Sequence, residues 1–522
     1  MLGAELILAL LIAVAALVTI ARGIGVAYPV FLVIGGLGLG LVPGVPRIEI
    51  DPDLIFLIVL PPLLYVAAFF TPVRSLRANL GTISALAVAL VLATALAVAV
   101  VARALIPGMP WAVAIALGAI VAPPDAVAAT AIASRLGLPR QIVTILEGES
   151  LLNDATALTI YGMALTVAAG GAFSPAMAVT LFAGALVGGG VIGVAVGWAI
   201  AHIRARIDDT PVEMTISLLT PYAAFLPADR LGASGVIAAV AAGLYLGQRG
   251  SQIMGADARL TGRAVWDTLT FLLNGFVFIV MGLEVPLIMR ALTAERALAL
   301  VGVGLVICGV LIVVRAVFVF ATIFLPRLVG RHEVHWPVAC SLVLSWAGMR
   351  GVVSLAAALA LPTTLPVGGP FPARDAVIIV TLTVIVFTLL AQGLTLPWLI
   401  RRLGLAADPD LPAEEASARQ RLLHAATRRI DELYPVWPGH RPLLDQLRDT
   451  YRHRSEHVER QRDRSAGDGE DRELIEHREI KRTVIDSERE ALLRLRTEGE
   501  ISDEVLRHLE RELDLEERRM DA

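Results

Sequence analysis

The sequence predicts an all-helical protein that crosses a membrane many times, and three observations lead to that fold class. Of its 522 residues, 56% are hydrophobic and 18% are charged. Its apolar runs repeatedly reach the roughly 20 residues that a helix needs to cross a bilayer. From about residue 405 onward the character changes, because 52 of the last 117 residues are Asp, Glu, Lys or Arg. We therefore expect a transmembrane domain over residues 1–405 and a charged, mostly helical regulatory or assembly region over residues 406–522.

Apolar length divides the first region into about thirteen spans. Fourteen arginines lie in the loops on the side of the charged C-terminal region and at its border, against six on the other side. By the positive-inside rule, the C-terminal region is cytoplasmic and Met1 faces outward, as in a multi-pass protein of the plasma (inner) membrane. The expected spans are 3–21, 24–42, 54–71, 81–104, 110–132, 141–168, 176–201, 212–228, 232–247, 267–289, 297–325, 336–361 and 375–400.

The fifth span is interrupted in its middle by Pro123 and Pro124, which are followed by Asp125. Proline removes a backbone donor and clashes with the preceding turn, so this span cannot be one continuous helix. The freed carbonyls need partners inside a membrane, and a cation is one such partner. Discontinuous transporter helices hold coupling ions at breaks of this kind. The alternative is a proline kink in which Asp125 is a structural acceptor.

The sixth span contains the run "EGESLLNDATAL", residues 147–158. Ser150 and Asp154 are four residues apart and share one face of a helix, with Asn153 one step round and Glu149 behind. Hydroxyl, amide and carboxylate oxygens suit a hard monovalent cation. A buried carboxylate at Asp154 can carry a proton or a cation, but not both together, which is the exclusivity that ion exchange requires.

The twelfth span is weakened by Gly348 and Gly351 on either side of Arg350. A buried arginine without a partner is very costly, so we expect a carboxylate beside it. We choose Glu149, which leaves the aspartates available for the transported ion. Arg315, in the preceding span, is a possible supporting residue to which the sequence assigns no partner.

The remaining acids of the spans have less definite roles. Glu147, Glu213 and Asp267 lie near span ends, where a wetted position at the membrane surface is expected. Glu284 lies deeper in its span and is equally compatible with a wetted position at the membrane surface and with a buried one.

The broken fifth and twelfth spans stand seven apart, and each is followed by one more long span. This order predicts inverted repeats whose unwound helices cross at the membrane centre.

Four runs in order resemble the bacterial sodium/proton antiporters of the monovalent cation:proton antiporter-1 family, relatives of the eukaryotic sodium/proton exchangers. The runs are "PPDAVAAT", "EGESLLNDATAL", "LLTPYAAF…GASGVIAAVAAGLYLG" and "GMRGVVSLAAALALP". The resemblance covers residues 1–405. It implies a thirteen-helix homodimer with a six-helix core, a secondary transporter and not an enzyme, which exchanges Na⁺ or Li⁺ for H⁺ by alternating access and needs no cofactor.

The resemblance also implies roles for individual residues. Asp154 corresponds to the main cation and proton carrier, with Asp125 and Ser150 as further Na⁺ ligands and the main-chain carbonyl of Pro124 completing the site. Asn153 before Asp154 resembles the electroneutral branch, which exchanges one proton for one cation. Two further residues correspond to the buried ion pair of the family: Glu149 and Arg350.

Other functions fit parts of the sequence. Potassium/proton exchange on the same fold is the nearest alternative, because the sequence does not give the ligand number or cavity size that separates the ions. Two aspartates on neighbouring spans, Asp125 and Asp154, would also suit an intramembrane aspartyl protease, although their Pro-Asp and Asn-Asp contexts differ from that class. A cation channel lacks an evident selectivity filter. No motif indicates a nucleic-acid partner.

Overall fold

The computed structural model describes residues 2–24, 28–42, 55–136, 138–171, 174–290, 293–328, 337–365, 369–405, 410–463, 472–498, 500 and 503–521. Within these residues the protein is helical, and its sole β-type pairing is an isolated bridge between Thr364 and Pro370. The prediction of an all-helical protein is therefore confirmed for the described part of the chain. The chain divides into two compact units, Met1–Asp408 and Pro409–Ala522.

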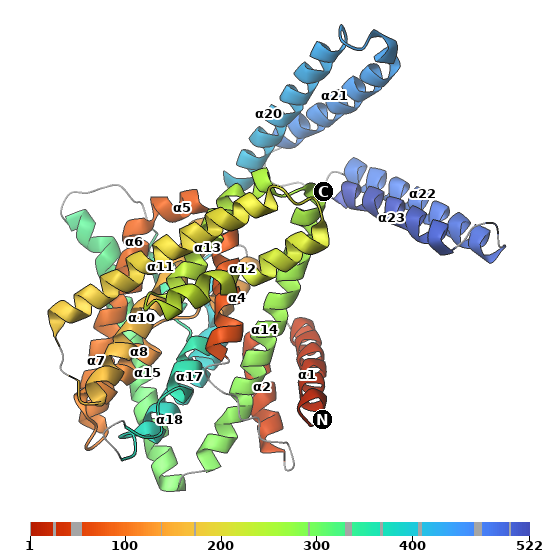
Figure 1. Ribbon diagram of the computed structural model, residues 1–522. Coiled ribbons are helices and arrows are strands. Elements are labelled where there is room, and N and C mark those ends of the chain that lie inside the picture. Colours follow the sequence, from red (N-terminus) through yellow and green to blue (C-terminus); the bar gives the residue numbers. More distant parts are fainter. Residues whose placement is uncertain are drawn as a thin grey trace. The chain divides into compact units, whose positions relative to one another are not determined.

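The first unit contains the apolar helices (Figure 1). Its first half consists of α1 (Leu2–Ile24), α2 (Tyr28–Leu41), η1 (Ile55–Val59), α4 (Leu60–Phe70), α5 (Val73–Ala78), α6 (Leu80–Ser84), η2 (Ala85–Leu90), α7 (Val91–Leu105), α8 (Trp111–Val121), α9 (Ala126–Leu136) and α10 (Arg140–Ala168). Its second half consists of α11 (Pro175–Arg204), α12 (Thr210–Arg230), α13 (Gly235–Ile253), α14 (Ala256–Arg290), α15 (Ala294–Leu328), α16 (Val338–Trp346), α17 (Val352–Leu359), α18 (Arg374–Phe387), η3 (Thr388–Gln392) and α19 (Gly393–Arg402). The η1, η2 and η3 segments are π-helical turns that continue directly into α-helix.

Six described helical segments are long and apolar enough to cross a membrane, and shorter apolar helices accompany them. The protein is thus a multi-pass membrane protein. Helix occupies each of the thirteen expected ranges where the structure describes them, but several of these helices are short, and the total of thirteen spans stays a prediction. The six long segments are Leu80–Leu105, Arg140–Ala168, Val179–Arg204, Ala256–Pro286, Ala294–Thr322 and Arg374–Arg402.

The helices of the first unit pack in two groups. In one group, α8 contacts α7, α10, α17 and α18, and in the other α13 contacts α4, α11 and α12. The long helix α14 packs chiefly along α2 (Figure 1). Glycines permit that contact, because a Cβ on Gly36 would overlap the backbone of Ile279 and one on Gly282 would overlap the backbone of Val33. Small residues of this kind let membrane helices approach backbone to backbone.

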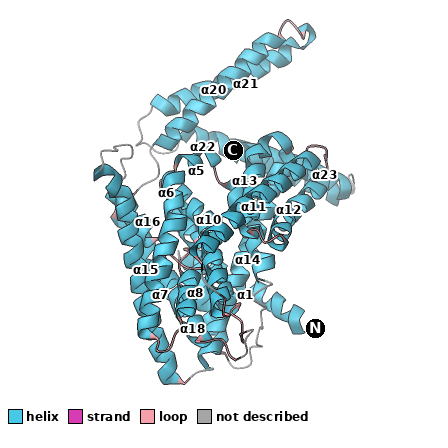
Figure 2. Ribbon diagram, turned by 60° about the vertical axis from the view of Figure 1, so that its left-hand side comes forward, coloured by secondary structure: helices cyan, strands magenta, loops and turns pink. Residues whose placement is uncertain are grey.

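The second unit consists of two helical hairpins, the first of which is clearly visible in Figure 2. One pairs α20 (Asp410–Leu433) with α21 (Arg441–Asp463), joined through the short 3₁₀ turn η4 (Pro438–His440); the other pairs α22 (Arg472–Thr497) with α23 (Asp503–Asp521). In the second hairpin Arg489 binds Asp514 and Glu517, each at 2.6 Å. The cytoplasmic location and the regulatory or assembly role of this unit stay predictions.

Candidate functional site

The two expected helix breaks are present, and they contact each other. Helix α8 ends at Val121 and α9 begins at Ala126, while α16 ends at Trp346 and α17 begins at Val352. Between the breaks, the backbone N–H of Asp125 donates to the carbonyl of Met349 at 2.7 Å. The prolines and glycines therefore bring two unwound segments, far apart in sequence, to one place in the fold.

Asp125 is fixed at the start of α9. Its Oδ1 accepts from the backbone N–H of Val127 at 2.8 Å, which satisfies one of the unpaired donors of the first helical turn. The carboxylate also lies against Gly351, where a Cβ would overlap it. Glycine at this position is thus a steric requirement of the contact between the breaks. Oδ1 of Asp125 is thus engaged by Val127, its Oδ2 lies against Gly351, and the residue also faces a cavity.

That cavity has a volume of about 150 Å³. It is large enough for a cation with several water molecules, since one water occupies about 30 Å³ in the liquid. Most of its wall is apolar and comes from η1, α4 and α17. Its polar side chains are Asp125, Thr130, Glu147, Ser150, Asp154, Asn274 and Ser354.

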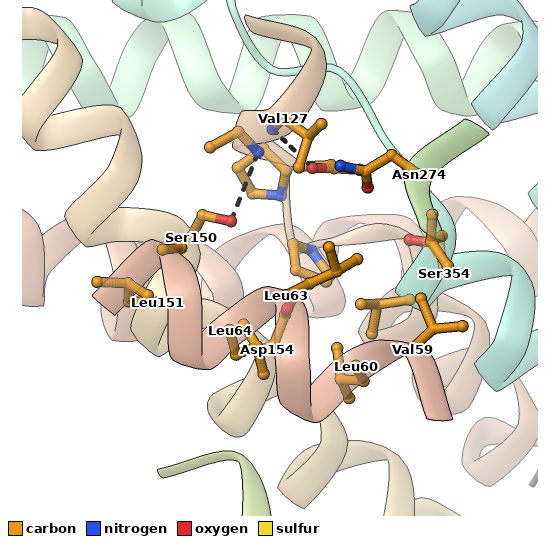
Figure 3. A pocket seen from close by; sticks show the side chains of 18 of the residues that line it. Val59, Leu60, Leu63, Leu64, Val127, Ser150, Leu151, Asp154, Asn274 and Ser354 are labelled. Atoms are coloured by element: carbon orange, nitrogen blue, oxygen red, sulfur yellow. Dashed lines mark hydrogen bonds between the residues drawn. The ribbon is translucent and has the colours of Figure 1, made fainter. Parts of the chain in front are cut away.

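Helix α10 contributes three of these residues, at intervals of three and four. Glu147, Ser150 and Asp154 form one stripe along the helix. The Ser150 hydroxyl accepts from the backbone N–H of Ala126 at 3.4 Å, which connects α10 to the break in α8–α9. The side chain of Asp154 is only 6% exposed, and no hydrogen bond or ion pair is found for it among the described residues. Figure 3 shows Ser150 and Asp154 on one side of the cavity.

Asn153 differs from the expectation that it would be a cation ligand. It is fully buried, does not line the cavity, and its Nδ2 donates to the carbonyl of Pro124 at 2.9 Å. The physical reason is the proline pair, which frees carbonyls that must be satisfied away from water. Pro124 does line the cavity, and its carbonyl keeps a second lone pair.

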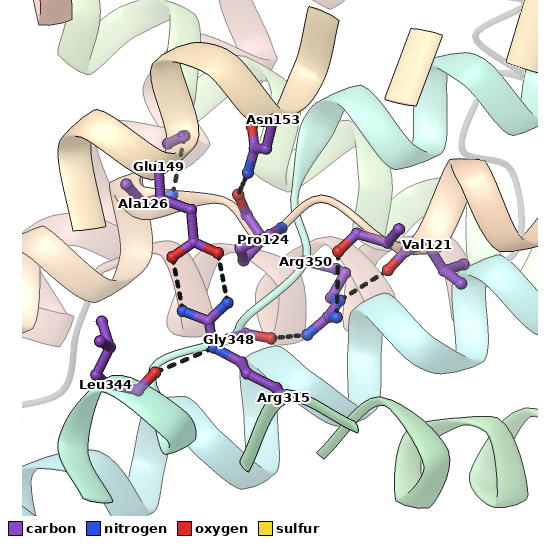
Figure 4. Close-up of polar contacts among 11 residues, drawn as sticks. Val121, Pro124, Ala126, Glu149, Asn153, Arg315, Leu344, Gly348 and Arg350 are labelled. Atoms are coloured by element: carbon purple, nitrogen blue, oxygen red, sulfur yellow. Dashed lines mark hydrogen bonds and ion pairs between the residues drawn. The ribbon is translucent and has the colours of Figure 1, made fainter. Parts of the chain in front are cut away.

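The expected ion pair of Glu149 with Arg350 is wrong. Glu149 binds Arg315 at two points, with Nη1–Oε1 at 2.6 Å and Nη2–Oε2 at 2.8 Å (Figure 4). Arg315 also donates from Nε to the carbonyl of Leu344 at 3.0 Å. Both charged side chains are at most 2% exposed. A planar guanidinium matches a carboxylate in this two-point geometry, so Arg315 rather than Arg350 neutralises the buried charge.

Arg350 binds backbone carbonyls instead of a carboxylate. Its Nε donates to Val121 at 2.9 Å, its Nη2 to Ala122 at 3.4 Å and its Nη1 to Gly348 (Figure 4). The last carbonyls of an interrupted helix carry partial negative charge and lack intrahelical partners. The breaks themselves therefore supply the acceptors that stabilise Arg350.

Residues outside the predicted set also belong to the cavity or to buried pairs. Glu147 lines the cavity, and its spacing of seven residues from Asp154 could have indicated this. Glu213 was expected in a wetted position but is 4% exposed and binds Arg204 at 3.3 Å. Asp267 is exposed beside Arg263, 4.0 Å away. Glu284 is partly buried and is not among the residues that line the cavity.

Three comparisons relate the chain to known proteins. Residues 8–402 match the family model described as sodium/hydrogen exchanger, transmembrane. The chain is 37% identical to an uncharacterised Na⁺/H⁺ exchanger of Mycobacterium tuberculosis, over 99% of this chain and 96% of the relative. It is 31% identical to a sodium, potassium, lithium and rubidium/H⁺ antiporter of Bacillus pumilus, over 77% of this chain and 62% of the relative. Its fold is similar to that of the sodium/proton antiporter MjNhaP1 of Methanocaldococcus jannaschii at pH 8, with a TM-score of 0.60, 20% identity and coverage of 77% of this chain and 99% of that one.

Proposed function

The chain belongs to the family of transmembrane sodium/hydrogen exchangers, and from that premise we propose that Na⁺ and H⁺ compete for the carboxylate of Asp154. Exchange of Na⁺ for H⁺ is the activity of the family, so the protein is a secondary transporter and not an enzyme. The Asp125–Asp154 combination accordingly does not indicate an aspartyl protease. Na⁺ and H⁺ are the substrates, and the proposal requires no resident cofactor.

The environment of Asp154 is the observation that carries the proposal. A buried carboxylate without a hydrogen bond or counter-ion is very costly. Asp154 meets this description among the described residues, whereas Glu149 is neutralised by Arg315 and Asp125 is engaged by Val127. Asp154 must therefore take up a proton or a cation from the cavity, and each ion excludes the other.

The cation ligands are oxygens that surround the cavity. In this proposal Asp154 binds Na⁺ together with the Ser150 hydroxyl and the second carboxylate oxygen of Asp125, and the carbonyl of Pro124 completes the set. Protonation of Asp154 removes its charge and releases the cation. Asn153 is neutral and holds the helix break, so the neighbouring position adds no second titrating group. One proton is then exchanged for one cation.

Alternating access is proposed to move one helix group against the other. The broken helices belong to the group around α8, and the cavity also borders α4 and α14, so a shift between the groups would expose Asp154 to each side in turn. We propose that the broken helices cross at the membrane centre within thirteen spans related by an inverted repeat. The second unit then lies in the cytoplasm, Met1 lies outside, and the protein is a homodimer.

Potassium is the second candidate cation. The observation that favours it is the similarity to the Bacillus pumilus relative, which is described as a sodium, potassium, lithium and rubidium/H⁺ antiporter. The apolar wall and modest volume of the cavity are compatible with any of these ions. The experiment below ranks them.

The proposal is tested with purified protein in sealed vesicles under an imposed proton gradient. Na⁺, Li⁺ or K⁺ is added and lumenal pH is followed, with the membrane potential clamped to zero. We expect cation-dependent proton movement for the native protein and none for Asp154→Asn. Exchange that persists in correctly folded Asp154→Asn would refute the assignment, and cation flow without proton movement would indicate a channel.

A further inference from the structure

Helix α14 places an unexplained amide in the cavity wall. Asn274 is 1% exposed and lines the cavity, and among the described residues neither its Nδ2 nor its Oδ1 has a hydrogen-bond partner. The hydroxyl of Tyr28 on α2 comes near it without reaching hydrogen-bond geometry. A buried polar group left unsatisfied keeps the full cost of its desolvation. A buried amide in this state calls for a partner that enters the cavity.

A second neutral oxygen lies on the same side. Ser354 on α17 is 2% exposed, lines the cavity, and its hydroxyl has no hydrogen bond among the described residues. Figure 3 shows Asn274 and Ser354 together on the side opposite Ser150 and Asp154. The cavity therefore has the acidic stripe of α10 on one side and the uncharged groups of α14 and α17 on the other, while Asp125 lies against the start of α17.

We propose that Asn274 and Ser354 form the second half of the cation site and determine which monovalent cation is carried. The inference rests on the proposed function, in which the cation enters this cavity. Asp154 and Asp125 attract any monovalent cation. The number and position of the neutral oxygens opposite Asp154 set how completely a given ion is surrounded when its water is removed, and ions of different radius differ in that requirement.

The two neutral residues also come from different elements than Asp154 does. Asn274 is carried by α14, which packs along α2, whereas Asp154 is carried by α10, which packs along α8. A cation between Asn274 and Asp154 contacts both α14 and α10. Its binding is consequently sensitive to the relative position of these two helices.

The test uses substitutions of matched size in the vesicle assay, with rates expressed per folded protein. Asn274→Leu keeps the volume and removes both polar atoms. We expect it to raise the Na⁺ concentration for half-maximal exchange about tenfold, equivalent to about 1.4 kcal/mol, with a maximal rate within about twofold of native and an altered preference between Na⁺ and K⁺. Asn274→Asp, which keeps a side-chain oxygen, is expected to restore the native Na⁺ concentration for half-maximal exchange. Ser354→Ala is expected to raise that concentration, as Asn274→Leu does.

Val353→Ala is the control, because Val353 also lines the cavity but offers no polar atom. It is expected to leave half-saturation and ion preference unchanged. The inference would be overturned if Asn274→Leu kept the native half-saturating Na⁺ concentration and the native preference between Na⁺ and K⁺. This holds even if the folded yield or the maximal rate falls, because Asn274 would then have a structural role only. Asp154→Asn is measured in parallel. If Asp154→Asn is inactive while Asn274→Leu behaves like the native protein, the proposed function stands and only the inference about Asn274 fails. If Asp154→Asn is active, both the proposed function and the inference fail.

Discussion

The guanidinium of Arg315 on α15 donates two hydrogen bonds to the carboxylate of Glu149 on α10, with N–O distances of 2.6 and 2.8 Å. Glu149 lies five residues before Asp154, and its charge is neutralised within the protein. The pair therefore removes one carboxylate from competition for the cation. It also fixes α10, the helix that carries the stripe of cavity residues, to α15.

Breaking this pair from one side should destabilise the fold more than removing it altogether. Glu149→Gln leaves the guanidinium of Arg315 buried without its counter-ion. Arg315→Met likewise leaves the carboxylate of Glu149 buried without its counter-ion. Each single variant is expected to lose about 3–5 kcal/mol of unfolding free energy. The double variant should recover more than half of the summed loss. Thermal unfolding of the three purified variants in detergent checks this, and strictly additive losses would contradict the pairing.

A substitution of Arg350 should show much weaker coupling to Glu149→Gln than a substitution of Arg315 does. Arg350→Met leaves the carbonyls of Val121, Ala122 and Gly348 without their donors, at about 1–3 kcal/mol for each unsatisfied group. Because Arg350 does not bind Glu149, the combination with Glu149→Gln should show little recovery, with a coupling less than half of that for Arg315. The same unfolding measurement provides the comparison. A coupling as large as that of the Arg315 pair would show that Arg350 is the true partner.

Gly351 should be required for transport rather than for helix formation. A Cβ at this position overlaps the carboxylate of Asp125 and would push it away from Val127. We expect Gly351→Ala to lower the exchange rate at least about tenfold, a loss of about 1.4 kcal/mol of transition-state stabilisation. Gly309→Ala on α15 is the control, since a Cβ there meets no atom within 4 Å. Equal rates for the two variants would contradict the close contact between the breaks.

Glu147 should attract cations to the cavity without binding them tightly. It lines the cavity about two helical turns, or roughly 10 Å along the axis, from Asp154. Glu147→Gln is expected to raise the Na⁺ concentration for half-maximal exchange about two- to fivefold at low ionic strength, and less at high ionic strength, because the field of a single charge is screened by salt. The maximal rate should be retained. An effect independent of ionic strength would assign Glu147 a different role.

The sequence was a sufficient guide to the features that depend on local chemistry. The prolines at positions 123 and 124 and the glycines at 348 and 351 interrupt their helices where the backbone lacks donors or side-chain support. The spacing of Ser150 and Asp154 on one helix also predicted a shared face, and the structure places both in one cavity with Asp125.

The choice between competing long-range partners was not predictable in this way. Arg315 on α15 and Arg350 in the break between α16 and α17 are both buried, and nothing in their spacing says which one reaches Glu149. That choice depends on how α15 and α16 pack against α10. The role of Arg350 was hidden for a further reason, because its acceptors are backbone carbonyls that carry no sequence signal. Asn274 was overlooked because an amide was not counted among the costly groups of the spans.

The pH dependence of Na⁺ affinity tests the central claim most directly. Native protein in vesicles is assayed at a series of Na⁺ concentrations and symmetrical pH values, with the membrane potential clamped to zero. If one proton and one Na⁺ compete for Asp154, the half-saturating Na⁺ concentration should rise about tenfold for each unit by which pH falls while the protonated carboxylate predominates, since tenfold more protons must be displaced. At higher pH it should level off, and the maximal rate at saturating Na⁺ should follow a separate pH profile. A half-saturating Na⁺ concentration that stays constant across the acidic range would contradict competition at Asp154.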